Sequence, residues 1–161
     1  MSASAVARSR SRAVAARVAL IAYLLLVAFT VWLPAAVSGK VVGLVVLAAR
    51  WVAQQGIVSY EASLISLEFL ANVAFLVPVG ALVALGWPRL RLWHVVVIGF
   101  LMSGLIESVQ SVIPSRAPSV SDVVANTLGA LMGAAIVAVA RKRRRRRDVL
   151  SPAPREQPRP R

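Results

Sequence analysis

The chain has 161 residues, of which 58% are hydrophobic, with a mean hydropathy of +0.74 and a net charge of +13 at pH 7. A soluble domain of this length cannot bury so much apolar surface, so a membrane protein with a single domain is expected. The absence of cysteine excludes disulfides, thiolate metal sites and cysteine nucleophiles.

The positive charge is concentrated at the two ends of the chain. Residues 1–17 carry four arginines, and residues 141–161 carry ten Lys or Arg against two acidic residues, which leaves residues 18–140 with a net charge of +1. Both ends are predicted to be disordered basic tails that bind the anionic headgroups of membrane lipids. Arginine runs also bind nucleic acid. Because these tails flank membrane spans, lipid is the expected partner and nucleic acid is not.

The first apolar run, residues 18–33, predicts a membrane span. A cleaved signal peptide is the alternative, because the run follows several arginines and precedes small residues. The apolar core is long for a signal peptide, which favours an uncleaved span. The next apolar stretch, residues 41–53, would form a helix of about 20 Å, short of a hydrocarbon core of about 30 Å. An interfacial or re-entrant helix is therefore predicted there.

Three further spans are predicted over residues 69–87, 92–113 and 120–140. Pro78 lies inside the first of these and predicts a kink, because proline lacks an N–H and clashes with the carbonyl of Ala74. The predicted fold class is therefore all-α: a polytopic membrane bundle of four transmembrane helices plus the short interfacial or re-entrant helix. The transmembrane domain is predicted to cover residues 18–140.

The charges also predict the orientation of the bundle. With four spans, both termini and the 88–91 turn lie on one side, which then holds 16 of the 19 basic residues. The positive-inside rule places that side in the cytoplasm, so a multi-pass cell-membrane protein with both termini cytoplasmic is expected. A five-span arrangement would put the two tails on opposite sides, which the distribution of charge opposes.

Acidic and amide side chains crowd at the predicted outer ends of the spans. They occur in pairs three or four residues apart, so that each pair shares one face of its helix: Glu68 with Asn72, Glu107 with Gln110, and Asp122 with Asn126. Charge within hydrocarbon is costly and is usually partnered and functional. Three such faces at similar depth predict one outward-facing polar pocket.

Arg116, in the loop before the last span, is placed to neutralise Glu107 or Asp122, or to hold an anionic ligand group. The alternative interpretation is purely structural. The amides would only hydrogen-bond neighbouring helices, and Asp122 would only stabilise the first turn of its own helix. Glu107 lies about 9 Å below the predicted end of its span, where a functional role is favoured. Gly129 and Gly133 form a GxxxG motif that is predicted to pack the last span inside the monomer.

Four motifs in this order resemble the VanZ-like family. They are the segment from Asn72 through Pro78 to Gly80, then Glu107-x-x-Gln110, then Pro114-x-Arg116, and finally Asp122-x-x-x-Asn126-x-x-Gly129-x-x-x-Gly133. The resemblance covers residues 68–135. Many relatives carry a further acidic residue in the loop after the arginine, where this chain has Ser119 and Ser121. The resemblance implies a bacterial cell-envelope protein linked to low-level resistance to the glycopeptide antibiotic teicoplanin.

The first functional hypothesis is a pocket that binds an amphiphilic envelope ligand, such as a lipid-linked cell-wall precursor, a phospholipid or a lipoglycopeptide. Its predicted ligand-binding residues are Glu68, Asn72, Glu107, Gln110, Arg116, Asp122 and Asn126. The alternatives are a lipid-modifying enzyme with Glu107 or Asp122 as general acid or base, and a proton-coupled transporter, which the apolar inner halves of the spans disfavour. No cofactor and no metal are predicted, and the sequence leaves the catalytic residues and the oligomeric state open.

Overall fold

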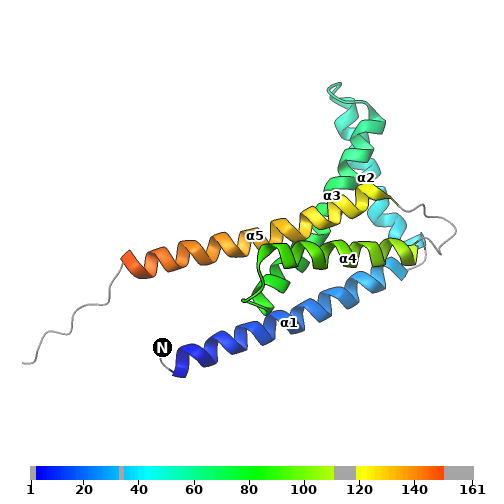
Figure 1. The fold of residues 1–161 in the computed structure, drawn as a ribbon. Coiled ribbons are helices and arrows are strands. Elements are labelled where there is room, and N and C mark those ends of the chain that lie inside the picture. The colour runs from blue at the N-terminus through cyan, green and yellow to red at the C-terminus, as the bar shows by residue number, and fades with distance from the viewer. Residues whose placement is uncertain (1–2, 33–34, 111–118, 151–161) are drawn as a thin grey trace, which may run out of the picture.

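The computed structural model describes residues 3–32, 35–110 and 119–150, and these residues form five helices and no strand (Figure 1). The helices are α1 (Ala3–Trp32), α2 (Ala35–Gln54), α3 (Tyr60–Gly86), α4 (Leu92–Gln110) and α5 (Val120–Leu150). By length and composition, α1, α3 and α5 each contain a stretch able to cross a membrane, whereas the apolar stretches of α2 and α4 are shorter. The predicted all-α membrane bundle is confirmed.

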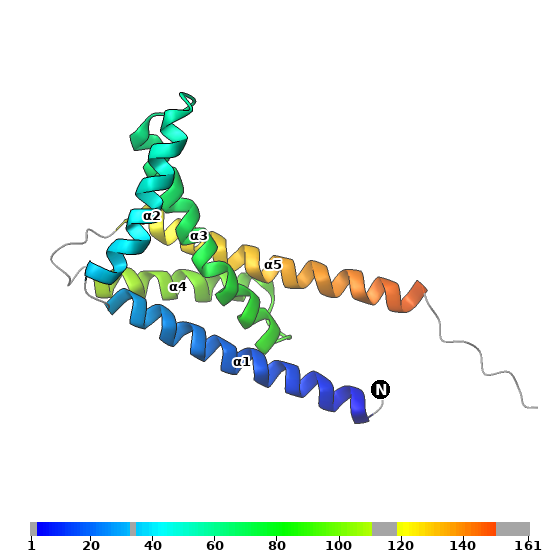
Figure 2. The same cartoon turned by 180° about the vertical axis from the view of Figure 1, so that it is seen from behind.

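Helix α3 is the centre of the bundle, because it packs against each of the other four helices. Helices α1, α4 and α5 share one general direction and α3 crosses them at an angle (Figures 1 and 2). The described beginning of α1, the turn between α3 and α4, and the end of α5 lie toward one end of the bundle. The described ends of α1 and α4 and the beginnings of α2 and α5 lie toward the other end.

Helix α2 and the first part of α3 form a hairpin that projects away from the direction of the remaining helices (Figures 1 and 2). The turn between them contains Gly56 at φ +72°, a left-handed conformation that glycine adopts without steric cost. Helix α3 then begins after Ser59, whose hydroxyl accepts a hydrogen bond from the N–H of Ala62 at 3.3 Å. The helix predicted over residues 41–53 is present, but it begins six residues earlier, at Ala35. Helix α3 begins nine residues before the span predicted at residue 69.

The contact between α3 and α5 depends on glycine. A Cβ atom at Gly133 would overlap the carbonyl oxygen of Val77, and one at Gly129 would overlap the carbonyl oxygen of Val73. From the other side, a Cβ at Gly80 would overlap the backbone of Ala130. Small residues allow helix backbones to approach closely in membranes, where van der Waals packing replaces the hydrophobic effect as the driving force. The GxxxG motif therefore joins α5 to α3 within the monomer.

A buried apolar core fills the middle of the bundle. It is built from side chains of α1, α3, α4 and α5: Leu20, Leu76, Val79, Val83, Val95, Ala130 and Ala134. On the same helix, Pro78 lies inside α3 and leaves the carbonyl of Ala74 without its usual donor. One residue further along, the carbonyl of Phe75 accepts a hydrogen bond at 2.8 Å from the hydroxyl of Tyr23 in α1. Neighbouring helices can in this way supply donors where proline disturbs a membrane helix.

Two arginines from the flanking helices bind the carbonyl end of α3. Arg17 of α1 donates from Nε to the carbonyl of Gly86 at 3.0 Å and lies 4.9 Å from the centre of the Trp87 ring. Arg141 of α5 donates to the carbonyl of Ala84 at 2.9 Å. The last carbonyls of a helix have no partner within the helix and carry partial negative charge, so cations stabilise this end.

The predicted disordered tails differ from the structure where it describes them. Helix α1 begins at Ala3 and takes in most of residues 1–17, and α5 continues past the predicted end at 140 through the arginine run to Leu150. Alanine and arginine are good helix formers, and once an apolar segment has nucleated a helix each added residue gains a hydrogen bond. Repulsion between the like charges of residues 141–147 is therefore too weak to end α5.

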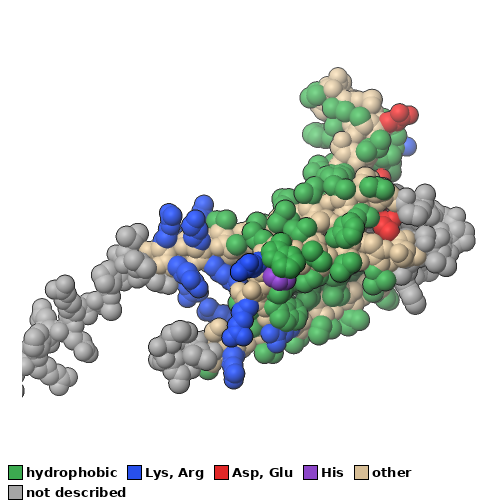
Figure 3. All heavy atoms as spheres, viewed as in Figure 1, with side chains coloured by type: hydrophobic (Ala, Val, Ile, Leu, Met, Phe, Trp, Pro, Cys, Tyr) green, Lys and Arg blue, Asp and Glu red, His purple; other side chains and the backbone are tan. Residues whose placement is uncertain are grey.

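The surface of the bundle is divided by chemistry. Large apolar side chains such as Leu25, Phe100 and Ile136 are more than half exposed. Figure 3 shows hydrophobic side chains over the middle of the molecule, most of the Lys and Arg side chains at one end, and acidic side chains toward the other. An exposed apolar band between polar ends is the pattern expected of a protein whose solvent is a bilayer.

Candidate functional site

Glu107 of α4 lies where α5 begins. Its side chain is buried, with 8% of its surface exposed, and its Oε2 accepts a hydrogen bond at 3.0 Å from the backbone N–H of Ser119. Ser119 immediately precedes α5, and its carbonyl accepts from the N–H groups of Asp122 and Val123. The carboxylate is thus held at the N-terminus of α5, whose free N–H groups and dipole favour a negative charge.

A second polar contact joins α4 to α5 one helical turn deeper. Ser103 is fully buried and lies four residues before Glu107, so the two side chains share a face of α4. Its hydroxyl oxygen accepts a hydrogen bond at 3.0 Å from Nδ2 of Asn126, which is 5% exposed. The face of α4 that carries Glu107 is therefore turned toward the face of α5 that carries Asn126.

A third contact brings α3 into the same cluster. Asn72 donates from Nδ2 to Oδ1 of Asp122 at 2.8 Å, and both side chains are half-buried. Asp122 lies in the first turn of α5, four residues before Asn126. We call the set joined by these three contacts the polar cluster: Asn72, Ser103, Glu107, Ser119, Asp122 and Asn126.

The structure places four of the seven predicted ligand-binding residues in the polar cluster, namely Asn72, Glu107, Asp122 and Asn126. Glu68 is exposed on α3, one turn before Asn72, and its side chain forms no hydrogen bond or ion pair with the other described residues. Gln110 is the last residue of α4, and its side chain is outside the described part. Arg116, with its predicted role in charge neutralisation, also lies outside the described residues.

The polar cluster can bind a polar group or transfer a proton, because it sets two carboxylates and two amides at one helix N-terminus. Among the described residues, no three His, Asp or Glu side chains come together in a way that could hold a metal ion. A groove lies elsewhere, between the basic ends of α1 and α5, and no polar-cluster residue lines it.

Two members of the polar cluster, Ser103 and Ser119, are not among the seven predicted ligand-binding residues. The prediction that Arg116 neutralises Glu107 or Asp122, or holds an anionic ligand group, concerns a residue outside the described part. Within the described chain, the partner of Glu107 is the backbone N–H of Ser119. The position of Ser119 could have indicated this contact, because serine is a favoured helix-capping residue and Ser119 lies immediately before the apolar run of α5. Its hydroxyl also lies 2.6 Å from that of Ser121.

No curated protein and no solved structure matches the chain. A family model described as VanZ/LLP1 matches residues 20–141, which include α2, α3 and α4 whole, the second part of α1 and most of α5. The matched segment thus holds the whole polar cluster, and it covers well over half of the sequence. The chain is a member of the VanZ/LLP1 family.

Proposed function

We propose that this VanZ-family membrane protein binds an amphiphilic cell-envelope ligand at the polar cluster, with the cluster facing the outside of the cell. The observation that carries the proposal is the burial of Glu107 and Asn126 beside the half-buried Asp122 at one helix N-terminus. Membrane helices rarely contain ionisable side chains unless these serve a function. A lipid-linked cell-wall precursor or a lipoglycopeptide such as teicoplanin combines polar groups for the cluster with an apolar tail for the surrounding lipid.

The apolar core favours binding over transport. Leu76, Val79 and Val83 of α3 and Val95 of α4 are buried between the polar cluster and the opposite end of the bundle. A proton-coupled transporter needs polar groups or a water-filled path on both sides of its site. In the described part of the chain, the buried polar residues are Ser63, Ser103, Glu107 and Asn126, all toward the end where α5 begins or in the α2–α3 hairpin.

Glu107→Gln is expected to abolish the function while leaving the fold intact, because the amide keeps the shape and an acceptor for Ser119 but removes the charge. A deletion strain carrying this variant should be as susceptible to teicoplanin and other envelope antibiotics as the empty deletion strain. The matched control is Glu61→Gln, which makes the same change at an exposed position in the first turn of α3. Wild-type susceptibility with a well-expressed Glu107→Gln protein would overturn the proposal.

The same pair of variants separates binding from catalysis. Purified wild type should be protected from heat by teicoplanin or by a polyprenyl-diphosphate-linked muropeptide, and Glu107→Gln should lose that protection. Turnover of a radiolabelled muropeptide lipid by wild type, lost in Glu107→Gln but kept in Glu61→Gln, would instead assign a general acid or base role to Glu107.

We also propose that both termini lie in the cytoplasm, which puts the polar cluster in the outer leaflet. The support is the positive-inside distribution of charge, with most of the Lys and Arg side chains gathered at the end of the bundle opposite the acidic side chains (Figure 3). Since the chain has no native cysteine, Ser115→Cys should react with a membrane-impermeant maleimide in intact spheroplasts, and Ser151→Cys only after permeabilisation. The reverse pattern would show the opposite orientation.

A further inference from the structure

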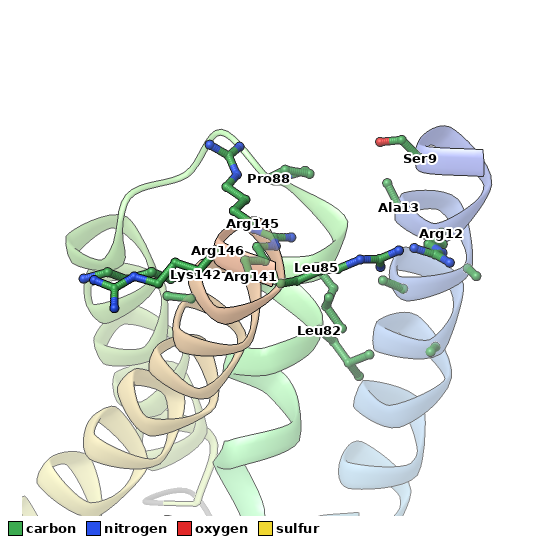
Figure 4. Close-up of a pocket in the computed structure, with 15 residues that line it drawn as sticks. Ser9, Arg12, Ala13, Leu82, Leu85, Pro88, Arg141, Lys142, Arg145 and Arg146 are labelled. Atoms are coloured by element: carbon green, nitrogen blue, oxygen red, sulfur yellow. The ribbon is translucent and has the colours of Figure 1, made fainter. Parts of the chain in front are cut away.

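A groove of about 1570 Å³ opens between α1 and α5 at the basic end of the bundle (Figure 4). Its floor is the end of α3, with Leu82 and Leu85, and Pro88 of the turn after it. Its walls are the first half of α1 and the last turns of α5. The groove exists because α1 and α5 each pack against α3 and extend past its end as separate helices (Figure 1). It lies at the opposite end of the molecule from the polar cluster.

One part of this groove is strongly cationic. Its lining includes Arg12 on α1 and a set of basic residues on α5, Arg141, Lys142, Arg144, Arg145 and Arg146, with no Asp or Glu among the lining residues. Figure 4 shows Arg12 across the groove from the basic side chains of α5. Arg141 is already bonded to the carbonyl of Ala84. Cations that face each other across a groove repel, so an anion between them would stabilise both walls.

The other part of the groove is apolar. Leu82 and Leu85 lie between the two walls in Figure 4, and the walls continue with small side chains, Ala15, Ala16, Ala19 and Ala138. A site for a small soluble anion needs only the cationic side chains and no apolar surface beside them. The volume of this groove exceeds the roughly 300–1,000 Å³ of ordinary small-molecule sites, and a surface of Leu, Pro and Ala beside the cations suits a molecule that has an acyl chain as well as an anionic group.

We infer that this groove is a binding site for an anionic glycerophospholipid of the membrane. The phosphate lies between Arg12 of α1 and Arg145 and Arg146 of α5, and an acyl chain runs along Leu82, Leu85 and Ala19 toward the bilayer interior. Lipid bound there fills the space between two helices that both pack against α3. Basic pockets between membrane helices are a recurring way of holding anionic headgroups.

The test is a titration of the detergent-purified, full-length protein with phosphatidylglycerol, followed through the thermal midpoint for loss of monodisperse protein. Phosphatidylglycerol should raise the midpoint and phosphatidylcholine should not. The triple variant Arg12→Gln, Arg145→Gln, Arg146→Gln should raise the apparent Kd for phosphatidylglycerol by about tenfold or more, since each cation near an anionic lipid contributes about 1 kcal/mol. All three side chains are exposed, so the fold should survive the change.

The matched control is the triple variant Arg10→Gln, Arg143→Gln, Arg147→Gln. It removes the same charge from the same two helices, at exposed positions outside the groove lining. Its apparent Kd should stay within about threefold of wild type, because distant exposed charges are screened by salt. Equal weakening in the two triple variants would show diffuse attraction of the lipid to the basic helices and would overturn the assignment.

A second pair of variants tests the apolar part. Ala19→Phe places a ring in the groove and should weaken phosphatidylglycerol binding, whereas Ala22→Phe, exposed on α1 outside the lining, should not. Equal affinity of these two variants would contradict an acyl chain in the groove. Stabilisation by glycerol 3-phosphate or by a short oligonucleotide as strong as that by lipid would likewise overturn the inference. The result is independent of Glu107, so the proposed function can fail while this site stands.

Discussion

Gly133→Ala is expected to lower the thermal midpoint of the purified protein by about 5–10 °C. A Cβ atom at this position overlaps the carbonyl oxygen of Val77 and crowds the amide nitrogen of Ala81, both backbone atoms of α3 that no rotamer change can move. The helices must separate, which loses the close packing that holds membrane helices together. Overpacking costs about 1–3 kcal/mol or more, and each kcal/mol shifts the midpoint by about 2–4 °C in a chain of this size.

The measurement is the fraction of monodisperse protein left after heating in detergent. Gly104→Ala is the matched control, because it makes the same substitution in α4 where an added Cβ meets nothing within 4 Å. Its midpoint should equal or exceed that of wild type, since alanine has the higher helix propensity. Gly129→Ala should behave like Gly133→Ala. Equal midpoints for Gly133→Ala and Gly104→Ala would contradict the tight crossing of α3 and α5.

Arg17→Gln is expected to destabilise the protein by about 1.5–3 kcal/mol, the usual worth of a hydrogen bond from a charged donor. The substitution removes the bond from Nε to the carbonyl of Gly86 and the cation above the Trp87 ring. The carbonyl end of α3 then keeps only Arg141 as an external donor among the described residues. The loss of stability is measured by heating the protein in detergent and following the remaining monodisperse protein by size-exclusion chromatography.

Arg10→Gln is the control for this second change. It removes one positive charge from the same helix at an exposed position, and surface substitutions of this kind usually stay within about 0.5 kcal/mol of wild type. Arg17→Lys should fall between the two, because lysine keeps the charge but loses the planar donor group. A stability for Arg17→Gln equal to that of Arg10→Gln would mean that the two contacts contribute nothing.

The helical architecture was readable from the sequence because apolar runs of sufficient length are a direct signal in membrane proteins. The starts of α2 and α3 were not. Tyr60 to Glu68 is mixed in polarity, and its helix depends on the Ser59 cap and on packing against α2, a tertiary contact that periodicity does not report. The helical extension of α5 was missed for a related reason, since charge was read as a stop signal although arginine favours helix.

The polar cluster was predictable in part, because spacing of three or four residues fixes which side chains share a helix face. That rule paired Glu68 with Asn72, yet only Asn72 meets Asp122. Asn72 already contacts the first turn of α5, so Glu68, one turn earlier on α3, lies past the point where α5 begins. How far two helices overlap depends on their crossing, which the sequence of either helix does not specify.

The paired arginines at the end of α3 have a consequence for biogenesis. Arg141 lies 57 residues after Ala84, so a nascent chain that has just released α3 has one cap, from Arg17, and lacks the other. The face of α3 against which Gly129 and Gly133 pack also stays uncovered until α5 emerges. A chain interrupted before α5 would therefore expose a close-packing helix face and a helix end with a missing donor, features by which quality control in the membrane can recognise an unfinished protein.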